Sequence, residues 1–434
     1  MDVAGLKEKI NNGLYDVAFR ELYGENVNIA ITRQRYLDCV DGFYENYGNK
    51  KYTGIRLFSV SGRSEFSGNH TDHNHGKVLC ASISLDIIAA AAKNDEDVIC
   101  VTSEGFGTDE VFVKTAGEVV EEEKFKSSAI IRGVLDGFEK SGKKTGGYYA
   151  YTTSDVLKGS GLSSSAAFED MIGNILNHFY NDGKVDSVEI AKISQYAENV
   201  HFGKPCGLMD QLGCAVGGVI AIDFEDAKNP KVEKMNFDLD KAGLSLCIVN
   251  TGGSHADLNE DYASIPIDMK KTAAFLGVEY LRDTSKEKLI ENAAKIREKL
   301  GDRCFMRALH FFDENERVKI QTKALKEKNV PLFLEKVRES GLSSFTMLQN
   351  VYTQKNVNEQ GISVALALSS TVLSDDKNAA YRVHGGGFAG TIQAFVPNEK
   401  VKSYKNTLEK VFTKDSVYVL KVRKHGAVCL DELV

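Results

Sequence analysis

A short stretch at residues 159–165 holds two glycines and four serines, the last three serines in a row: Gly159, Ser160, Gly161, Leu162, Ser163, Ser164 and Ser165. Apolar residues then recur at helical spacing from Ala166 to Phe179, so we expect a helix that begins near the serines. The start of a helix offers unpaired backbone N–H groups and a partial positive charge. Glycines let the backbone approach an anion closely, and serine hydroxyls add donors that can also bind a metal ion. The stretch predicts a phosphate-binding loop; a turn that only caps a helix is the alternative.

Two acids, Glu198 and Asp210, bracket a predicted helix end and a turn. Transfer of a phosphoryl group needs one carboxylate for magnesium and another beside the hydroxyl that accepts the group. Two ordinary surface acids are the simpler interpretation. Asp210, however, lies among apolar residues such as Leu208 and Leu212, which predicts partial burial, and a buried carboxylate requires a partner. We expect Arg63 to be that partner and to keep Asp210 ionised.

A polar stretch with several glycines, residues 61–76, follows a predicted strand at 55–60 and is expected to be a functional loop. It contains Arg63, His70, Asp72, His73 and His75. The side chains could bind a metal ion, bond the hydroxyls of a sugar, or form a solvated loop. The spacing of the three histidines matches no typical metal site, so a zinc hydrolase is the least favoured interpretation.

Length and composition predict a cytoplasmic protein of two domains. A chain of 434 residues exceeds what one core usually serves. We expect a helical lead-in over residues 1–50, a first domain over 51–225 and a second over 226–434, because the composition turns charged near residue 225. A net charge of −7 does not favour nucleic acid or a membrane surface as partner. Eight scattered cysteines without a C-x-x-C pair favour free thiols in a reducing compartment.

The stretch Gly385–Gly390 matches the dinucleotide motif G-x-G-x-x-G letter for letter. That motif needs a helix after it, and residues 391–396 alternate like a strand instead. A dinucleotide-binding fold is therefore excluded by context.

Four segments, taken together, resemble the motifs of the galactokinase family of GHMP small-molecule kinases. Gly62-Arg63, followed by Asn69-His70-Thr71-Asp72-x-Asn74, is similar to that family's G-R-x-N-L-I-G and E-H-T-D-Y-N. Residues 159–167 resemble its ATP-binding motif, and residues 383–390 resemble its glycine-rich third motif. Between them, residues 197–211 match the segment A-E…P-C-G-I-M-D-Q. The motifs stand in the family's order over residues 55–400.

The resemblance implies an α/β (α+β) fold with an N-terminal domain like ribosomal protein S5 and a C-terminal ferredoxin-like domain. The active site would lie between the two domains. The implied activity is phosphorylation of the anomeric hydroxyl of D-galactose to galactose 1-phosphate, with ATP and Mg²⁺ as cofactors. We expect a monomer whose partners are the sugar and ATP, and no nucleic acid or membrane.

The resemblance also implies roles for individual residues. Asp210 would accept the proton of the sugar hydroxyl or orient that hydroxyl, and Arg63 would stabilise the transferring group. Ser165 and Glu198 would hold the metal ion, and Ser103 would lie near the nucleotide. The phosphates would bind Gly159, Ser160, Gly161, Leu162, Ser163, Ser164 and Ser165, and the sugar would contact Asn69, His70, Asp72, Gly207 and Tyr262.

Two departures bear on the identity of the sugar. The family usually has Glu where this chain has Asn69, and Tyr where it has His73. Asn keeps an acceptor oxygen but loses the charge, and charge-assisted hydrogen bonds are roughly twice as strong as neutral ones. A kinase of the same fold for another sugar, such as N-acetylgalactosamine, is therefore an alternative. A sugar sensor without catalytic activity is another, although the three serines and Asp210 are all present.

Overall fold

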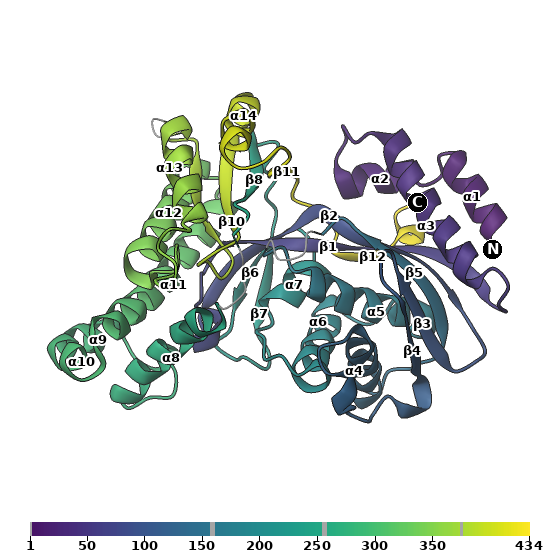
Figure 1. Ribbon diagram of the computed structural model, residues 1–434, viewed down its shortest axis with the longest axis horizontal. Coiled ribbons are helices and arrows are strands. Elements are labelled where there is room, and N and C mark those ends of the chain that lie inside the picture. Colours follow the sequence, from purple (N-terminus) through teal and green to yellow (C-terminus); the bar gives the residue numbers. More distant parts are fainter. Residues whose placement is uncertain (1, 157–160, 254–257, 374–375) are drawn as a thin grey trace.

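The structure is a computed structural model that describes residues 2–156, 161–253, 258–373 and 376–434. It holds two β-sheets with helices around them, which confirms the expected mixed α/β fold. Two long strands, β1 (Thr53–Ser67) and β2 (Lys77–Lys93), run through the middle of the molecule and reach both of its halves (Figure 1). Within these ranges, no helix has the length and apolar character needed to cross a membrane.

The first sheet has the strand order β12-β1-β2-β5-β3-β4, and β6 and β7 extend it from the first part of β2. Its strands pair antiparallel except β3 with β5, which run parallel. Besides β1 and β2 the sheet contains β3 (Val98–Ser103), β4 (Thr108–Phe112), β5 (Tyr148–Ser154), β6 (Val219–Asp223), β7 (Lys231–Met235) and β12 (Ala427–Cys429). β7 and β12 join this sheet although their residues fall in the expected second domain. The domain boundaries themselves stay a prediction.

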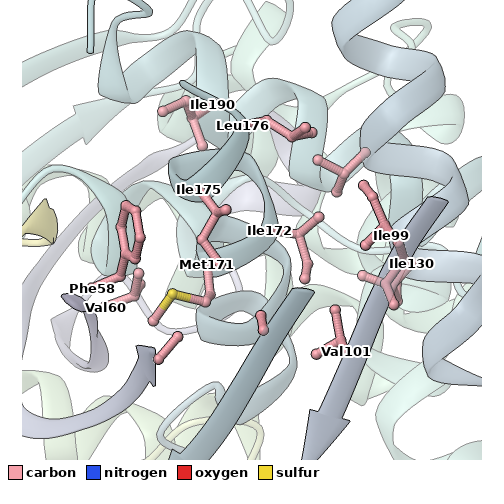
Figure 2. Packing of buried hydrophobic residues seen from close by; sticks show 14 of the residues in the cluster. Phe58, Val60, Ile99, Val101, Ile130, Met171, Ile172, Ile175, Leu176 and Ile190 are labelled. Atoms are coloured by element: carbon pink, nitrogen blue, oxygen red, sulfur yellow. The ribbon is translucent and has the colours of Figure 1, made fainter. Parts of the chain in front are cut away.

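Helices cover both faces of this sheet. Successive residues of a strand point to opposite faces, and the strands carry apolar residues on both. Leu57 packs under α1 (Val3–Asn11), α2 (Asp16–Tyr23) and α3 (Ile29–Tyr47), whereas its neighbour Phe58 packs against the helices of the other face. Those helices are α4 (Ser127–Lys140), α5 (Ser164–Tyr180), α6 (Ser187–Tyr196) and α7 (Met209–Ala215). Figure 2 shows Met171 and Ile172 of α5 among Phe58 and Val101 of the sheet, so α5 is anchored along the core.

The second sheet has the strand order β11-β8-β10-β9. Its strands are β8 (Leu244–Asn250), β9 (Ala380–His384), β10 (Thr391–Pro397) and β11 (Val417–Leu420). One face shares a core with Phe66 of β1, and the other is covered by α13 (Gly361–Leu373) and α14 (Val401–Val411). The remaining helices are α8 (Asn259–Phe275), α9 (Lys286–Glu291), α10 (Ala293–Leu300), α11 (Asp302–Lys326) and α12 (Val330–Ser343).

The expectation of one loop over residues 61–76 is wrong for its first half, because β1 continues to Ser67. Its polar residues lie inside the protein and find partners on other elements. The Ser61 hydroxyl donates to the Cys214 carbonyl at 3.1 Å, and the Ser67 hydroxyl donates to Glu314 at 2.8 Å. Buried hydroxyls with such bonds let a serine-rich segment form a buried strand. Arg63 is therefore held on a rigid strand rather than on a loop.

Candidate active site

The start of α5 has the features of an anion-binding site. The helix begins at Ser164, as the sequence predicts, and Ser163 is its N-cap residue with a left-handed backbone (φ 61°). The Ser163 side chain does not cap the helix, so it leaves the first N–H groups of α5 available to a ligand. Gly161 has φ 71°, a conformation that favours glycine. The expected loop residues Gly159 and Ser160 lie outside the described residues.

Three side chains from separate elements meet at this helix start. Arg63 donates from Nη2 and Nε to Asp210 Oδ1 at 2.7 and 3.0 Å, and Ser163 donates to Asp210 Oδ2 at 2.7 Å. Arg63 also donates from Nη1 to the carbonyl of Gly161. The expected pairing of Arg63 with Asp210 is confirmed. One arginine thus joins the carboxylate of α7 to the backbone of the phosphate loop.

The surroundings of Asp210 keep it ionised. Burial acts to raise the pKa of Asp210, but the charge of Arg63 and the hydrogen bonds from Ser163 and Arg63 outweigh it, so that this pKa lies below its usual 3.8. The side chain is 37% exposed, which leaves the carboxylate within reach of a bound molecule. A fixed, ionised carboxylate of this kind can orient a hydroxyl group and accept its proton.

A cavity of about 790 Å³ opens beside the start of α5. Ser164 and Ser165 line it from α5, and Ser103 lines it from the end of β3. The structure thus brings Ser103 together with the serines of the phosphate loop. Apolar and aromatic side chains form much of the remaining wall, among them Ile87, Phe106, Ile130, Phe168 and Phe202. Size and lining are typical of a cofactor site, and the aromatic rings suit a flat base.

Glu198, an expected metal ligand, lies in a buried cluster next to this cavity. It belongs to the π-helix η4 (Ala197–Phe202), and its Oε1 accepts a hydrogen bond from Lys204 at 3.0 Å. Gln211 donates from Nε2 to Glu198 Oε2 at 3.0 Å and to Glu169 Oε2 at 2.9 Å. Burial, and next the charge of Glu198, raise the pKa of Glu169. Glu169, which lines the cavity together with Ser165, has one buried oxygen without a partner among the described residues. These hard oxygen donors fit a divalent cation.

Three of the expected sugar-binding residues converge on a turn formed by Gly385, Gly386 and Gly387. Asn69 Nδ2 donates to the carbonyl of Gly385 at 2.8 Å. His70 Nε2 lies 3.0 Å from the carbonyl oxygen of Gly386, and the Tyr262 hydroxyl donates to that of Gly387 at 3.1 Å. The glycine turn is therefore held by the residues that were expected to hold a ligand.

The other two expected sugar contacts, Asp72 and Gly207, face each other. A Cβ atom added to Gly207 would lie 2.5 Å from Asp72 Oδ2, so a side chain at this position would collide with the carboxylate. The glycine turn also lies next to the phosphate loop, because a Cβ atom on Gly385 would be 3.8 Å from Gly161 Cα. The expected sugar and phosphate residues thus form neighbouring groups. Their roles in binding stay a prediction.

Two of the three histidines in residues 70–75 contact different elements of the protein, and the rings of His70 and His73 lie 6.2 Å apart. His70 faces the carbonyl of Gly386, whereas the His75 ring stacks on Tyr280 with ring centroids 3.8 Å apart. In the described parts of the chain, no three His, Cys, Asp or Glu side chains are arranged to hold a metal ion. A zinc centre on this segment, the least favoured interpretation, has no support.

Sequence reasoning missed a buried polar network under the glycine turn. Asn69 donates to Glu65 Oε1 at 3.1 Å and accepts from Asn350 at 2.8 Å, and Glu65 pairs with Arg382 at 3.0 Å. The polar groups of the Asn69 amide are therefore engaged within the protein. One signal was available in the sequence, since Glu65 stands where the motif of the resembled family has Asn, and Asn69 stands where that motif has Glu. The two residue types have exchanged places.

Comparisons with known proteins agree with this geometry. The model of the GHMP kinases N terminal domain matches residues 129–218, which include α5 and Asp210. The galactokinase galactose-binding signature matches residues 41–93, which include Arg63 and Asn69.

Full-length relatives cover most of the chain. A galactokinase from Actinobacillus pleuropneumoniae serotype 5b is 30% identical over 375 residues, which are 86% of this chain and 93% of the relative. A galactokinase from Streptomyces coelicolor is 30% identical over 361 residues, or 82% of this chain and 88% of the relative.

Solved structures share the fold. Lactococcus lactis galactokinase complexed with galactose superposes with a TM-score of 0.74 at 23% identity, covering 89% of this chain and 98% of that one. Methanococcus jannaschii mevalonate kinase gives a TM-score of 0.59 at 14% identity, covering 86% of this chain and 99% of that one. The arrangement of two sheets is therefore the fold of GHMP kinases.

Proposed function

The chain belongs to the galactokinase family, and on this premise we propose that it transfers the γ-phosphoryl group of ATP to the anomeric hydroxyl of D-galactose. The observation that carries the proposal is the position of Asp210. It is an ionised, reachable carboxylate fixed by Arg63 and Ser163 at the start of α5. A kinase needs such an acceptor facing the attacking hydroxyl, next to the site of the phosphates.

ATP would bind with its base in the 790 Å³ cavity and its phosphates at the start of α5. The first N–H groups of that helix and the hydroxyls of Ser164 and Ser165 would hold the phosphate oxygens. Gly161 would let the backbone approach the phosphates closely, because it has no side chain. Glycine also adopts the left-handed backbone at this position without strain.

The reaction would proceed by displacement at the γ-phosphorus. The anomeric oxygen of the sugar forms the new P–O bond, the bond from the γ-phosphorus to the bridging oxygen breaks, and ADP leaves. Asp210 orients the hydroxyl and takes up its proton as the P–O bond forms. The low pKa of Asp210 makes it a weak base, so the proton would move late, once the oxygen has become acidic by bonding to phosphorus. Arg63 keeps the carboxylate in place throughout.

Ser165 and Glu198 would hold the magnesium ion, with Glu198 kept in position by Lys204 and Gln211. The ion, when bound, neutralises charge on the phosphate oxygens.

Asn69, His70, Asp72, Gly207 and Tyr262 would surround the sugar. The hydrogen bonds of Asn69 and Tyr262 to the glycine turn support a role in shaping the pocket as well as in contacting its ligand. We further propose a monomer in the cytoplasm. The eight cysteines, all without a disulfide in the structure, support a reducing compartment.

Release of ADP, measured for a panel of sugars, tests the proposal. The panel holds D-galactose, N-acetylgalactosamine, other hexoses and pentoses, with a reaction lacking sugar as control. We expect the highest kcat/KM with galactose, and ³¹P NMR should place the phosphate on the anomeric oxygen. A higher kcat/KM with another sugar would reassign the substrate, and no sugar-dependent release of ADP would contradict a kinase.

A further inference from the structure

Glu169 is a buried acid that the proposed mechanism does not use, although it is one of the residues that border the proposed nucleotide cavity. It stands four residues after Ser165 on α5, and residues four apart lie on the same face of a helix. Both residues border the 790 Å³ cavity, and the Glu169 side chain is buried behind it. Glu169 therefore lies one helical turn after Ser165, an expected metal ligand, on the same face of α5.

Gln211 connects Glu169 to the second expected metal ligand. Its Nε2 group donates to Glu169 Oε2 at 2.9 Å and to Glu198 Oε2 at 3.0 Å, so one amide holds two carboxylates at a fixed spacing. Glu169 and Gln211 are both 0% exposed and Glu198 is 3% exposed. The arrangement is rigid and shielded from bulk water.

Two oxygens of this cluster lack a hydrogen-bond partner among the described residues: Glu169 Oε1 and Gln211 Oε1. A buried acceptor without a partner costs free energy, and in a native protein it calls for an explanation such as a bound ion.

The charges point to a cation as that ion. Arg63 is paired with Asp210, and Lys204 is paired with Glu198 through Oε1. Glu169 has no such ion pair among the described residues. Two neighbouring buried carboxylates disfavour each other's ionised form, and a divalent cation between them removes that penalty.

We propose that Glu169 acts with Glu198 in binding the divalent cation of the nucleotide, and that Gln211 is the positioning residue that sets their spacing. Magnesium in kinases is commonly bound by one or two carboxylates together with substrate phosphates, which this pair would supply. The inference rests on the proposed function, since it assumes that the nucleotide enters the cavity beside α5. It adds a carboxylate to the metal residues that the family resemblance implies.

Binding of Mn²⁺ tests the inference without relying on activity. Mn²⁺ is titrated into the protein carrying one equivalent of the non-hydrolysable analogue adenylyl imidodiphosphate, and free Mn²⁺ is measured by EPR. We expect Glu169→Gln to raise the dissociation constant by roughly 10- to 100-fold, the usual effect of losing a residue that supports a metal site.

Asp170→Asn is the matched control. Asp170 is the next residue on α5 and is equally buried, but it is not among the residues that line the cavity. The control should change the dissociation constant less than about threefold, since an ion at a distance is not held by this group. Thermal melting of each variant reports whether it is folded. Glu169→Asp, which keeps the charge but shortens the side chain, replaces Glu169→Gln if the latter does not fold.

Mn²⁺ binding by Glu169→Gln at the wild-type level would overturn the inference while leaving the proposed function intact. An equal loss in both variants would also overturn it, since the effect would then reflect buried charge in general. If the wild-type protein bound no Mn²⁺ with the nucleotide analogue, the proposed nucleotide site would fail as well.

Discussion

Replacing Asp210 with Asn removes the proposed proton acceptor with little change of shape. Asp210 Oδ1 accepts hydrogen bonds from Arg63, and Asp210 Oδ2 accepts one from the Ser163 hydroxyl. The amide oxygen of Asn can still accept from Arg63, and the Ser163 hydroxyl can turn to accept from the amide nitrogen. The fold and the phosphate loop should therefore remain, while the negative charge and the basic oxygen are lost.

The expected fall in kcat follows from the role of Asp210 as a general base. A positioned general base contributes about 10²- to 10⁴-fold to a rate, so kcat should fall by that factor, or about 2.7–5.4 kcal/mol in the barrier. The cost in folding stability should be smaller than the ~3–5 kcal/mol expected for breaking a buried pair. Asp210 is 37% exposed and Asn retains both contacts, so we expect about 1–2 kcal/mol.

The assay separates chemistry from binding. Initial rates at saturating galactose and ATP give kcat, and equilibrium binding of adenylyl imidodiphosphate gives nucleotide affinity, which should stay within about threefold of wild type because the contacts of α5 to phosphate are retained. Thermal melting shows whether the variant is folded. A folded Asp210→Asn protein with kcat within tenfold of wild type would refute the role of Asp210 as proton acceptor.

Three further predictions rest on single contacts or pKa shifts. Ser163→Ala removes one hydrogen bond to the Asp210 carboxylate, worth about 1.5 kcal/mol, so kcat at saturating ATP should fall roughly tenfold; an unchanged kcat would show that this bond does not position Asp210. Asp86→Asn breaks the buried ion pairs with Arg35 and Arg423, at 2.6 and 2.9 Å, and should lower the unfolding free energy in urea by about 3–5 kcal/mol while kcat stays near wild type. The pKa values of Asp86 and Glu314 in the folded protein lie below their usual 3.8 and 4.5, so both carboxylates stabilise the fold when the pH is above these usual values. The free energy of unfolding should therefore fall as the pH drops below about 4. An unfolding free energy that stays constant over this pH range would contradict the lowered pKa values.

The elements of the site could be predicted from sequence because each carries a local signal. The start of α5 follows from a run of small residues before a helical apolar pattern. The pairing of Arg63 with Asp210 follows from the apolar neighbours of Asp210, since a carboxylate among them requires a partner. The helix start and the need of Asp210 for a partner can be read from neighbouring residues, whereas the partner itself, Arg63, lies 147 residues earlier in the chain.

What escaped prediction depends on contacts between distant segments. The strand over residues 61–67 shows no alternation of apolar residues, because its serines are satisfied by partners such as Glu314, which lies 247 residues after Ser67. β12 joins the first sheet from the opposite end of the chain. Gln211 gives no sign in the sequence that it bonds Glu169 and Glu198 at once.

The exchange of Glu65 and Asn69 shows how sequence can point to a change without explaining it. The sequence shows that Glu and Asn have changed places relative to the family motif. Only the structure shows that the charge of Glu65 faces Arg382 in the interior, and that Asn69 binds the glycine turn.

A crystal structure with adenylyl imidodiphosphate and galactose bound tests the central claim most directly. The account predicts the triphosphate against residues 163–165 at the start of α5, and the anomeric oxygen of galactose at hydrogen-bond distance from Asp210, about 2.6–3.2 Å. A triphosphate bound away from that helix start, or a sugar whose anomeric oxygen faces away from Asp210, would contradict it.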